Sequence, residues 1–196
     1  MNRAKTGKGQ LSRSRLLQAA AAEFAANGFH RTKISDIVRR AGLTQAAFYL
    51  YFPSKEAVWL ELVSPFCERL RQIADAGRDV TPLAGADVIV QVRENLARLF
   101  RFLAERPEVT KIALFETDEG EAIKREIVAM VQANLVRNQA AGHVRRELSP
   151  EVAAECMVAV MERLTARYLL SGEKDAEQLA DEAVTFITHG ILRVNG

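Results

Sequence analysis

The chain has 196 residues, 48% of them hydrophobic, which is enough to bury a sizeable core in one or two domains. Its apolar runs are much shorter than a bilayer span, and its basic N-terminus lacks the apolar core of a secretion signal. We therefore expect a cytoplasmic protein without a membrane partner. The two cysteines and three histidines are scattered without ligand spacing, so we expect no metal, no cofactor and no disulfide.

Charge is unevenly distributed along the chain. Residues 1–55 hold ten basic and two acidic residues, a net charge of +8. Subtracting these from the chain totals of 27 and 25 leaves 17 basic and 23 acidic residues, a net charge of −6. A positive head on an acidic body is the electrostatic pattern expected of a protein that binds nucleic-acid phosphates. An ordinary solvated helix face gives the same count, so charge alone leaves both interpretations open.

Hydrophobic spacing predicts an all-α protein of about nine helices, with a small three-helix head and a larger C-terminal bundle. The first helix carries an apolar stripe from Leu16 to Phe24 and ends at Gly28. Residues 1–11, which precede this stripe, are predicted to form a flexible basic tail.

Residues 32–55, TKISDIVRRAGLTQAAFYLYFPSK, predict two short helices, a glycine turn and the start of a further helix. Apolar residues recur at helical spacing before Gly42, which suits the left-handed residue that ends a helix. Thr44 suits the N-terminal cap of the next helix, and Pro53 ends it. This order is typical of a helix-turn-helix, in which the start of the second helix contacts base edges in the major groove. Residues 1–55 are therefore predicted to be a DNA-binding domain.

The remaining residues, 56–196, are predicted to form a domain that binds a ligand and dimerises. Six further helices are expected at about 54–76, 88–103, 107–115, 121–141, 149–171 and 175–194. The last helix has a broader apolar face than one neighbouring helix needs. We expect a dimer built from the last two helices, with Phe186, Ile187 and Ile191 at its centre; a purely intramolecular core is the alternative.

The stretch from Ala19 to Val58 resembles the TetR family of one-component bacterial transcription regulators. The segments G-F-H-x-T-x-I-x-D-I, A-G-L-T and F-Y-x-Y-F-x-S-K-E occur in order at the spacing of that family. The resemblance implies a homodimer, a palindromic operator on double-stranded DNA and a ligand cavity in the C-terminal bundle. It also implies a repressor that leaves its operator when the ligand binds.

The same resemblance implies roles for single residues of the head. Gln45, Ala46 and Ala47 occupy positions that face base edges, where glutamine pairs with adenine and a methyl group touches thymine. Ser35 stands where some members place a base-reading arginine. Hydroxyl and ammonium groups of the others are implied to contact the phosphate backbone, with Lys55 acting beside the dipole of its helix. The predicted DNA-binding set is Thr32, Lys33, Ser35, Thr44, Gln45, Ala46, Ala47, Tyr49, Tyr51 and Lys55.

The C-terminal helices are rich in aliphatic residues and methionines, which suit a long apolar guest, and their arginines suit an anionic head group. The pattern of helices in this part of the chain somewhat resembles that of regulators of fatty-acid breakdown, which bind acyl-CoA esters. An acyl-CoA is therefore the predicted effector. A lipophilic cation is the alternative, because the cluster of acidic residues around Gly120 supplies carboxylates. The predicted pocket set is Leu99, Phe102, Phe115, Met130, Met157, Met161, Arg98, Arg101, Arg163 and Arg167.

Two other classes of protein compete with a regulator. An enzyme is disfavoured because the sequence has no glycine-rich phosphate loop and no recognisable arrangement of catalytic residues. A non-specific DNA-packaging protein would use charge without a base-reading helix, and the acidic body argues against it.

Overall fold

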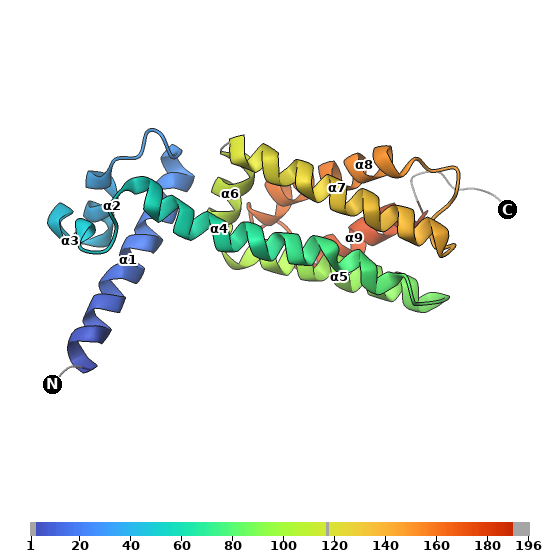
Figure 1. The fold of residues 1–196 in the computed structure, drawn as a ribbon, viewed down its shortest axis with the longest axis horizontal. Helices are drawn as coiled ribbons and strands as arrows, with labels where there is room; N and C mark the ends of the chain where they lie inside the picture. The colour runs from blue at the N-terminus through green and yellow to red at the C-terminus, as the bar shows by residue number, and fades with distance from the viewer. Residues whose placement is uncertain (1–2, 117, 190–196) are drawn as a thin grey trace. The chain divides into compact units, whose positions relative to one another are not determined.

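The computed structural model describes residues 3–116 and 118–189, and within these ranges the regular structure is entirely helical, as predicted (Figure 1). Nine α-helices lie in this part of the chain. Their bounds are α1 Arg3–Asn27, α2 Ile34–Ala41, α3 Gln45–Tyr49, α4 Lys55–Ala74, α5 Ala86–Glu105, α6 Pro107–Phe115, α7 Asp118–Ala140, α8 Pro150–Leu164 and α9 Ala176–His189. A 3₁₀ segment, η1 (Asp75–Val80), follows α4, and a π-helical turn, η2 (Thr165–Leu169), follows α8.

Two predicted boundaries differ from the structure. The structure assigns residues 3–11 of the predicted flexible tail to the start of α1, which begins at Arg3. The last helix was expected to reach about residue 194, but residues 190–196, including Ile191, lie outside the described residues.

The chain divides into two compact units, and the division differs from the predicted one between residues 55 and 56. The first unit comprises Met1–Cys67 and Glu108–Gly120, and the second comprises Glu68–Pro107 and Glu121–Gly196. Helix α4 therefore belongs to both units, and α6 belongs to the first. One cause is visible within the first unit, where the Lys111 ammonium of α6 donates to the Ala25 carbonyl oxygen of α1 at 2.7 Å.

The core of the first unit is aromatic. Phe24 and Phe48 are fully buried, and the Phe24 ring lies 5.6 Å from the ring of Trp59 on α4. The Phe29 ring completes this cluster at 4.9 Å from Trp59. Such tilted and edge-on ring pairs contribute more to stability than the burial of their surface area alone. They therefore stabilise the packing of α1 against the start of α4 in the unit that carries α2 and α3.

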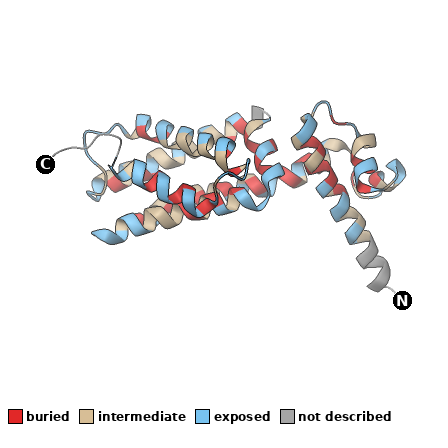
Figure 2. Ribbon diagram, turned by 180° about the vertical axis from the view of Figure 1, so that it is seen from behind, coloured by how far each residue is buried: buried red, intermediate tan, exposed pale blue. Residues whose placement is uncertain are grey.

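The core of the second unit lies where α5 packs on α9. Phe100 of α5 and Leu179 of α9 are fully buried, and Figure 2 shows buried and exposed positions alternating along these helices. At the edge of this contact, Arg93 of α5 forms ion pairs with Glu177 at 3.0 Å and Asp181 at 2.6 Å. The apolar faces predicted for these helices are therefore covered largely by other parts of the same chain.

Two buried asparagine side chains of α7 form hydrogen bonds to the end of α4 and to η1. Asn134 donates from Nδ2 to the Ala74 carbonyl oxygen at 3.0 Å, and Asn138 donates to that of Gly77 at 3.2 Å. A side chain at Gly77 would place its Cβ 2.6 Å from the Asn134 amide, so only glycine fits there. These bonds satisfy backbone carbonyls at the end of α4 that the helix itself leaves without partners.

Candidate nucleic-acid interface

Helix α2 has clear local start and stop signals. Its N-terminal cap, Lys33, has extended backbone angles, and its amide N–H donates to the Asp36 carboxylate at 3.2 Å. Gly42 ends the helix with φ 63°, a left-handed conformation that side chains rarely adopt. The chain thus reverses between α2 and α3 in the tight turn that the sequence predicted.

Helix α3 is capped by Thr44, whose hydroxyl oxygen accepts from the Ala47 N–H at 3.1 Å. The helix is five residues long and ends at Tyr49, two residues before the predicted Tyr51. Phe48 points into the core with no exposed surface, whereas Gln45 and Ala46 are exposed on the other face. A buried aromatic anchor therefore fixes how the start of α3 is presented.

The two tyrosines that follow Phe48 differ in exposure. Tyr49 is 57% exposed, and the neighbouring Leu50 is 81% exposed. Tyr51 is half-buried, and its hydroxyl lies beside α1, 3.7 Å from where a Cβ at Gly9 would stand. The structure therefore brings Thr44, Gln45, Ala46 and Tyr49 together on one exposed face.

Three of the ten basic residues in the head form ion pairs within the chain. Arg40 pairs with Glu23 at 2.6 Å, Arg39 pairs with Asp36 at 2.9 Å, and Arg13 pairs with Glu61. Each of these guanidiniums attracts an external phosphate less strongly than an unpaired guanidinium would, because an adjacent carboxylate compensates its charge.

Arg15 is a candidate phosphate contact that sequence reasoning missed. It is exposed and has no hydrogen bond or ion pair to any described residue. Its guanidinium lies over the turn between α2 and α3, since a Cβ built at Gly42 would stand 2.9 Å from Nη2. Helical spacing along α1 gives no sign of this proximity, because the contact joins residues that are distant in the chain.

Two of the predicted phosphate contacts are corrected by the structure. Thr32 is only 2% exposed, and its hydroxyl donates to the Gly28 carbonyl oxygen at 2.8 Å. The Lys55 ammonium donates to the carbonyl oxygens of Phe29 at 2.8 Å and Thr32 at 2.9 Å, and it lies 4.4 Å from the centre of the Phe29 ring. Thr32 is therefore an internal residue, and Lys55 fastens the loop before α2 to the start of α4.

Replacing Lys55 with methionine should lower the free energy of unfolding by about 1–3 kcal/mol, because two carbonyl groups lose a charged donor. Urea denaturation followed by circular dichroism measures the change. The matched variant Lys33→Met removes an exposed ammonium and should change stability by no more than about 0.5 kcal/mol. The contrary result is full stability of Lys55→Met together with a decrease of about one in the number of counterions released on DNA binding. That result would support the phosphate contact and contradict the structural role.

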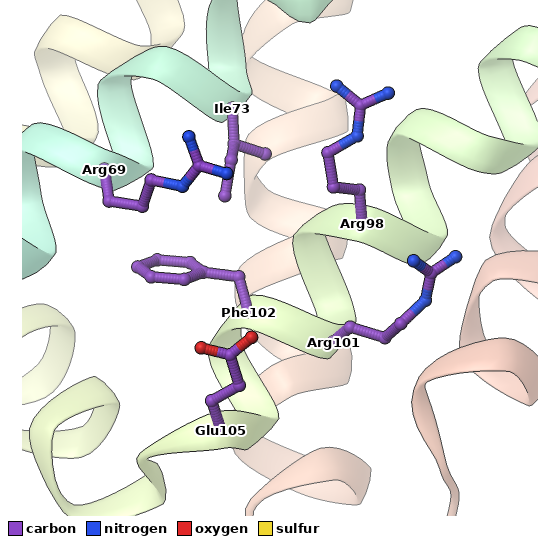
Figure 3. A pocket seen from close by; sticks show the side chains of 6 residues that line it. All are labelled: Arg69, Ile73, Arg98, Arg101, Phe102 and Glu105. Atoms are coloured by element: carbon purple, nitrogen blue, oxygen red, sulfur yellow. The ribbon is translucent and has the colours of Figure 1, made fainter.

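In the second unit, a hollow of about 330 Å³ lies between α4 and α5 (Figure 3). It is lined by Arg69, Ile73, Arg98, Arg101, Phe102 and Glu105. Three residues of the predicted pocket set, Arg98, Arg101 and Phe102, are among them. The structure therefore brings together only the part of that set that lies on α5.

The other predicted pocket residues do not line this hollow. Phe115 lies on α6 in the first unit. Arg167 is paired with Glu173 and stacks over the Tyr168 ring at 5.1 Å, and Arg163 is exposed on α8. The four remaining residues are half-buried; they are Leu99, Met130, Met157 and Met161.

The predicted dimer residues have different surroundings. Phe186 is 45% exposed, and Ile187 is half-buried. On α8, Ala153 and Ala154 are buried, whereas Val152 is 61% exposed. Within the described residues, an apolar surface therefore stays uncovered on the last two helices even after α9 packs on α5.

Two kinds of feature are absent from residues 3–116 and 118–189. No helix there is long and apolar enough to cross a membrane. No group of three or more histidine, cysteine or acidic side chains in this part of the chain is arranged to hold a metal ion.

Comparison with known proteins defines the class. Residues 16–62 match the family model for bacterial regulatory proteins of the tetR family. The chain is 41% identical over 185 residues to the uncharacterized HTH-type transcriptional regulator YdgC of Bacillus subtilis, covering 94% of this chain and 95% of that protein. The chain therefore belongs to the TetR family of helix-turn-helix transcriptional regulators.

Solved structures show the same fold. PfmR, a TetR family transcriptional regulator from Thermus thermophilus, superposes with a TM-score of 0.71 at 21% identity, covering 91% of this chain and 100% of PfmR. FadR, a transcriptional regulator from Bacillus subtilis crystallised with stearoyl-CoA, superposes with a TM-score of 0.65 at 20% identity, covering 91% of this chain and 99% of FadR. Both similarities extend over the second unit as well as the helix-turn-helix.

Proposed function

We propose that this chain is a ligand-responsive repressor that binds a palindromic operator as a homodimer and leaves it when a long-chain acyl-CoA binds. The observation that carries the DNA-binding part is the presentation of α3. Phe48 is fully buried while Gln45 and Ala46, one turn earlier, are exposed. A short helix with one face packed on the core and the other face exposed can enter the major groove, which admits one α-helix.

The exposed side chains of α3 suit base reading. Gln45 has an amide that both donates and accepts, the geometry that pairs with the edge of adenine. Ala46 offers a methyl group to thymine. Arg15, Lys33 and Tyr49 are also exposed and carry donors for the phosphate backbone, and such contacts fix the register without reading sequence.

A homodimer follows from the two-fold symmetry expected of such operators. Each copy would place its α3 in one of two successive major grooves, about 34 Å apart. The uncovered apolar residues of α8 and α9, Val152 and Phe186 among them, are the surface on which we place the two-fold contact. An isologous contact of this kind uses the same patch on both copies.

An acyl-CoA is the effector favoured by the chemistry of the second unit. Half-buried methionines on α7 and α8 offer adaptable apolar surface, and α5 carries Arg98, which has no ion pair to any described residue. The FadR structure with stearoyl-CoA shares the fold, which makes this class of ligand a reasonable first choice. Lipophilic cations are the alternative effector; Glu105 in the hollow is the one carboxylate that favours them.

Helix α4 is the element through which we propose the ligand acts. It begins at Lys55 in the first unit and ends at Ala74 in the second, so it is a single helix shared by both. A ligand changes DNA affinity only as far as it binds the DNA-competent and released conformations with different free energies.

Palmitoyl-CoA should weaken operator binding by about 5-fold to 150-fold, a coupling free energy of about 1–3 kcal/mol. The measurement is an operator titration by fluorescence anisotropy with acyl-CoAs of several chain lengths, beside free CoA and lipophilic cations. Free CoA should have no such effect, because it lacks the apolar chain. Release by the cations alone would favour the drug-responsive alternative and contradict the acyl-CoA proposal.

A further inference from the structure

Two guanidinium groups in the hollow between α4 and α5 have no carboxylate partner. Arg98 has no hydrogen bond or ion pair to any described residue. Arg69, on α4, forms one hydrogen bond, from Nη1 to the Gln72 side-chain oxygen at 3.0 Å, and no ion pair within the described chain. Figure 3 shows both guanidiniums beside Ile73 at the top of the hollow. Two uncompensated positive charges at one cavity repel each other and favour an anion between them.

Arg101 lines the same hollow but is already neutralised. It pairs with Glu94 at 2.9 Å and Glu177 at 2.8 Å, and Figure 3 shows its guanidinium pointing away from Arg69. These hydrogen bonds, first that of Glu94 and then that of Glu177, hold the pKa of Arg101 above its ordinary value. The positive potential of the hollow therefore comes from Arg69 and Arg98.

The rest of the lining suits a flat ring with an amino group. Ile73, which is 6% exposed, and the half-buried Phe102 form an apolar floor. Glu105 stands on the side of Phe102 away from Arg98, where its carboxylate can accept from an amino group (Figure 3). A volume of about 330 Å³ is at the lower end of the range of small-molecule sites.

We propose that this hollow binds the phosphate-bearing nucleotide portion of the acyl-CoA, an assignment that rests on the proposed function. The phosphates accept from Arg69 and Arg98, because guanidiniums bind phosphate through paired, charge-assisted hydrogen bonds. The adenine ring lies on Ile73 and Phe102, and its amino group donates to Glu105. The site therefore distinguishes a CoA thioester from a free fatty acid, which lacks both phosphates and adenine.

Isothermal titration of the full chain with 3′,5′-ADP and with CoA tests the assignment without the acyl chain. Wild type should bind both, and Arg69→Gln and Arg98→Gln should each raise the dissociation constant by about tenfold or more. The matched control Arg146→Gln removes an exposed guanidinium outside the hollow and should leave the affinity unchanged. Equal binding of 3′,5′-ADP by wild type and both hollow variants, or no binding by wild type, would overturn the assignment.

Operator release separates this failure from failure of the proposed function. If palmitoyl-CoA releases wild type but releases both hollow variants only at about tenfold higher concentration, the assignment is supported. If it releases all three at the same concentration, the hollow is wrong and the repressor proposal stands. If it does not release wild type, the acyl-CoA proposal fails and the assignment of this hollow fails with it.

Discussion

Replacing Ala46 with glutamate should weaken operator binding by about 100-fold or more while leaving the fold intact. Ala46 is exposed on the second residue of α3, so the new side chain meets no protein atoms in the core. It does meet the negative field of the DNA, and like charges placed across an interface cost several kcal/mol. An acidic residue in the first turn of a helix is also locally favourable, so α3 should still form.

Fluorescence anisotropy with a labelled operator at fixed salt measures this loss, and circular dichroism checks the fold. Ala104→Glu is the matched control, because it adds the same charge at an exposed position of α5. Operator affinity within about threefold of wild type for Ala46→Glu would contradict the placement of α3 in the major groove, since a charge worth several kcal/mol could not then face the DNA.

Replacing Phe186 with glutamate should convert the dimer into a monomer and lower operator affinity, although the helix-turn-helix is untouched. In the single chain Phe186 is 45% exposed, so the change should not unfold α9. In the proposed two-fold contact the same residue is covered, and an unpaired charge there is strongly unfavourable. Each monomer then binds its half-site independently, so the affinity that the dimer gains by binding two half-sites together is lost.

Sedimentation velocity measures the assembly state of this variant. Val136→Glu is the matched control, because Val136 is an apolar residue of α7 with 51% exposure that lies outside the proposed contact. If Phe186→Glu sedimented as wild type does, the two-fold contact would have to be built from other residues. If Val136→Glu alone became monomeric, α7 would replace α9 in the assignment.

The helix-turn-helix was predictable because its determinants are local. Thr44 caps α3 with its own hydroxyl, and Gly42 takes the left-handed conformation that a side chain resists. Phe48 and Phe52 lie four residues apart, and both are buried. Each of these features depends on residues within a few positions, so the sequence pattern determines them.

The direction of single polar side chains was not predictable in the same way. Thr32 and Lys55 match the family motif, yet the structure turns the hydroxyl and the ammonium toward backbone carbonyls of the same unit. Arg15 entered only through the charge count, although its guanidinium lies over the turn at Gly42. These arrangements depend on contacts between residues more than 20 positions apart for Lys55 and Arg15, which spacing along one helix does not encode.

The ligand set was the least predictable part of the chain. Arg98, Arg101 and Phe102 share one hollow because they lie within about one turn of α5. Arg69 and Ile73 were missed, because only packing brings α4 beside α5 there. Phe115 does not line this hollow, since its part of α6 belongs to the first unit. Apolar side chains of a helical bundle look alike in sequence whether they line a cavity or fill the core.

Selection of binding sites from random duplexes by the wild-type chain and by Gln45→Ala tests the central claim most directly. Wild type should select a palindromic consensus. The variant should lose base preference at one position in each half-site, at a cost of about 1–3 kcal/mol, because a bidentate contact is removed. Selection of the same consensus by both proteins, or of no consensus by wild type, would contradict base reading by α3.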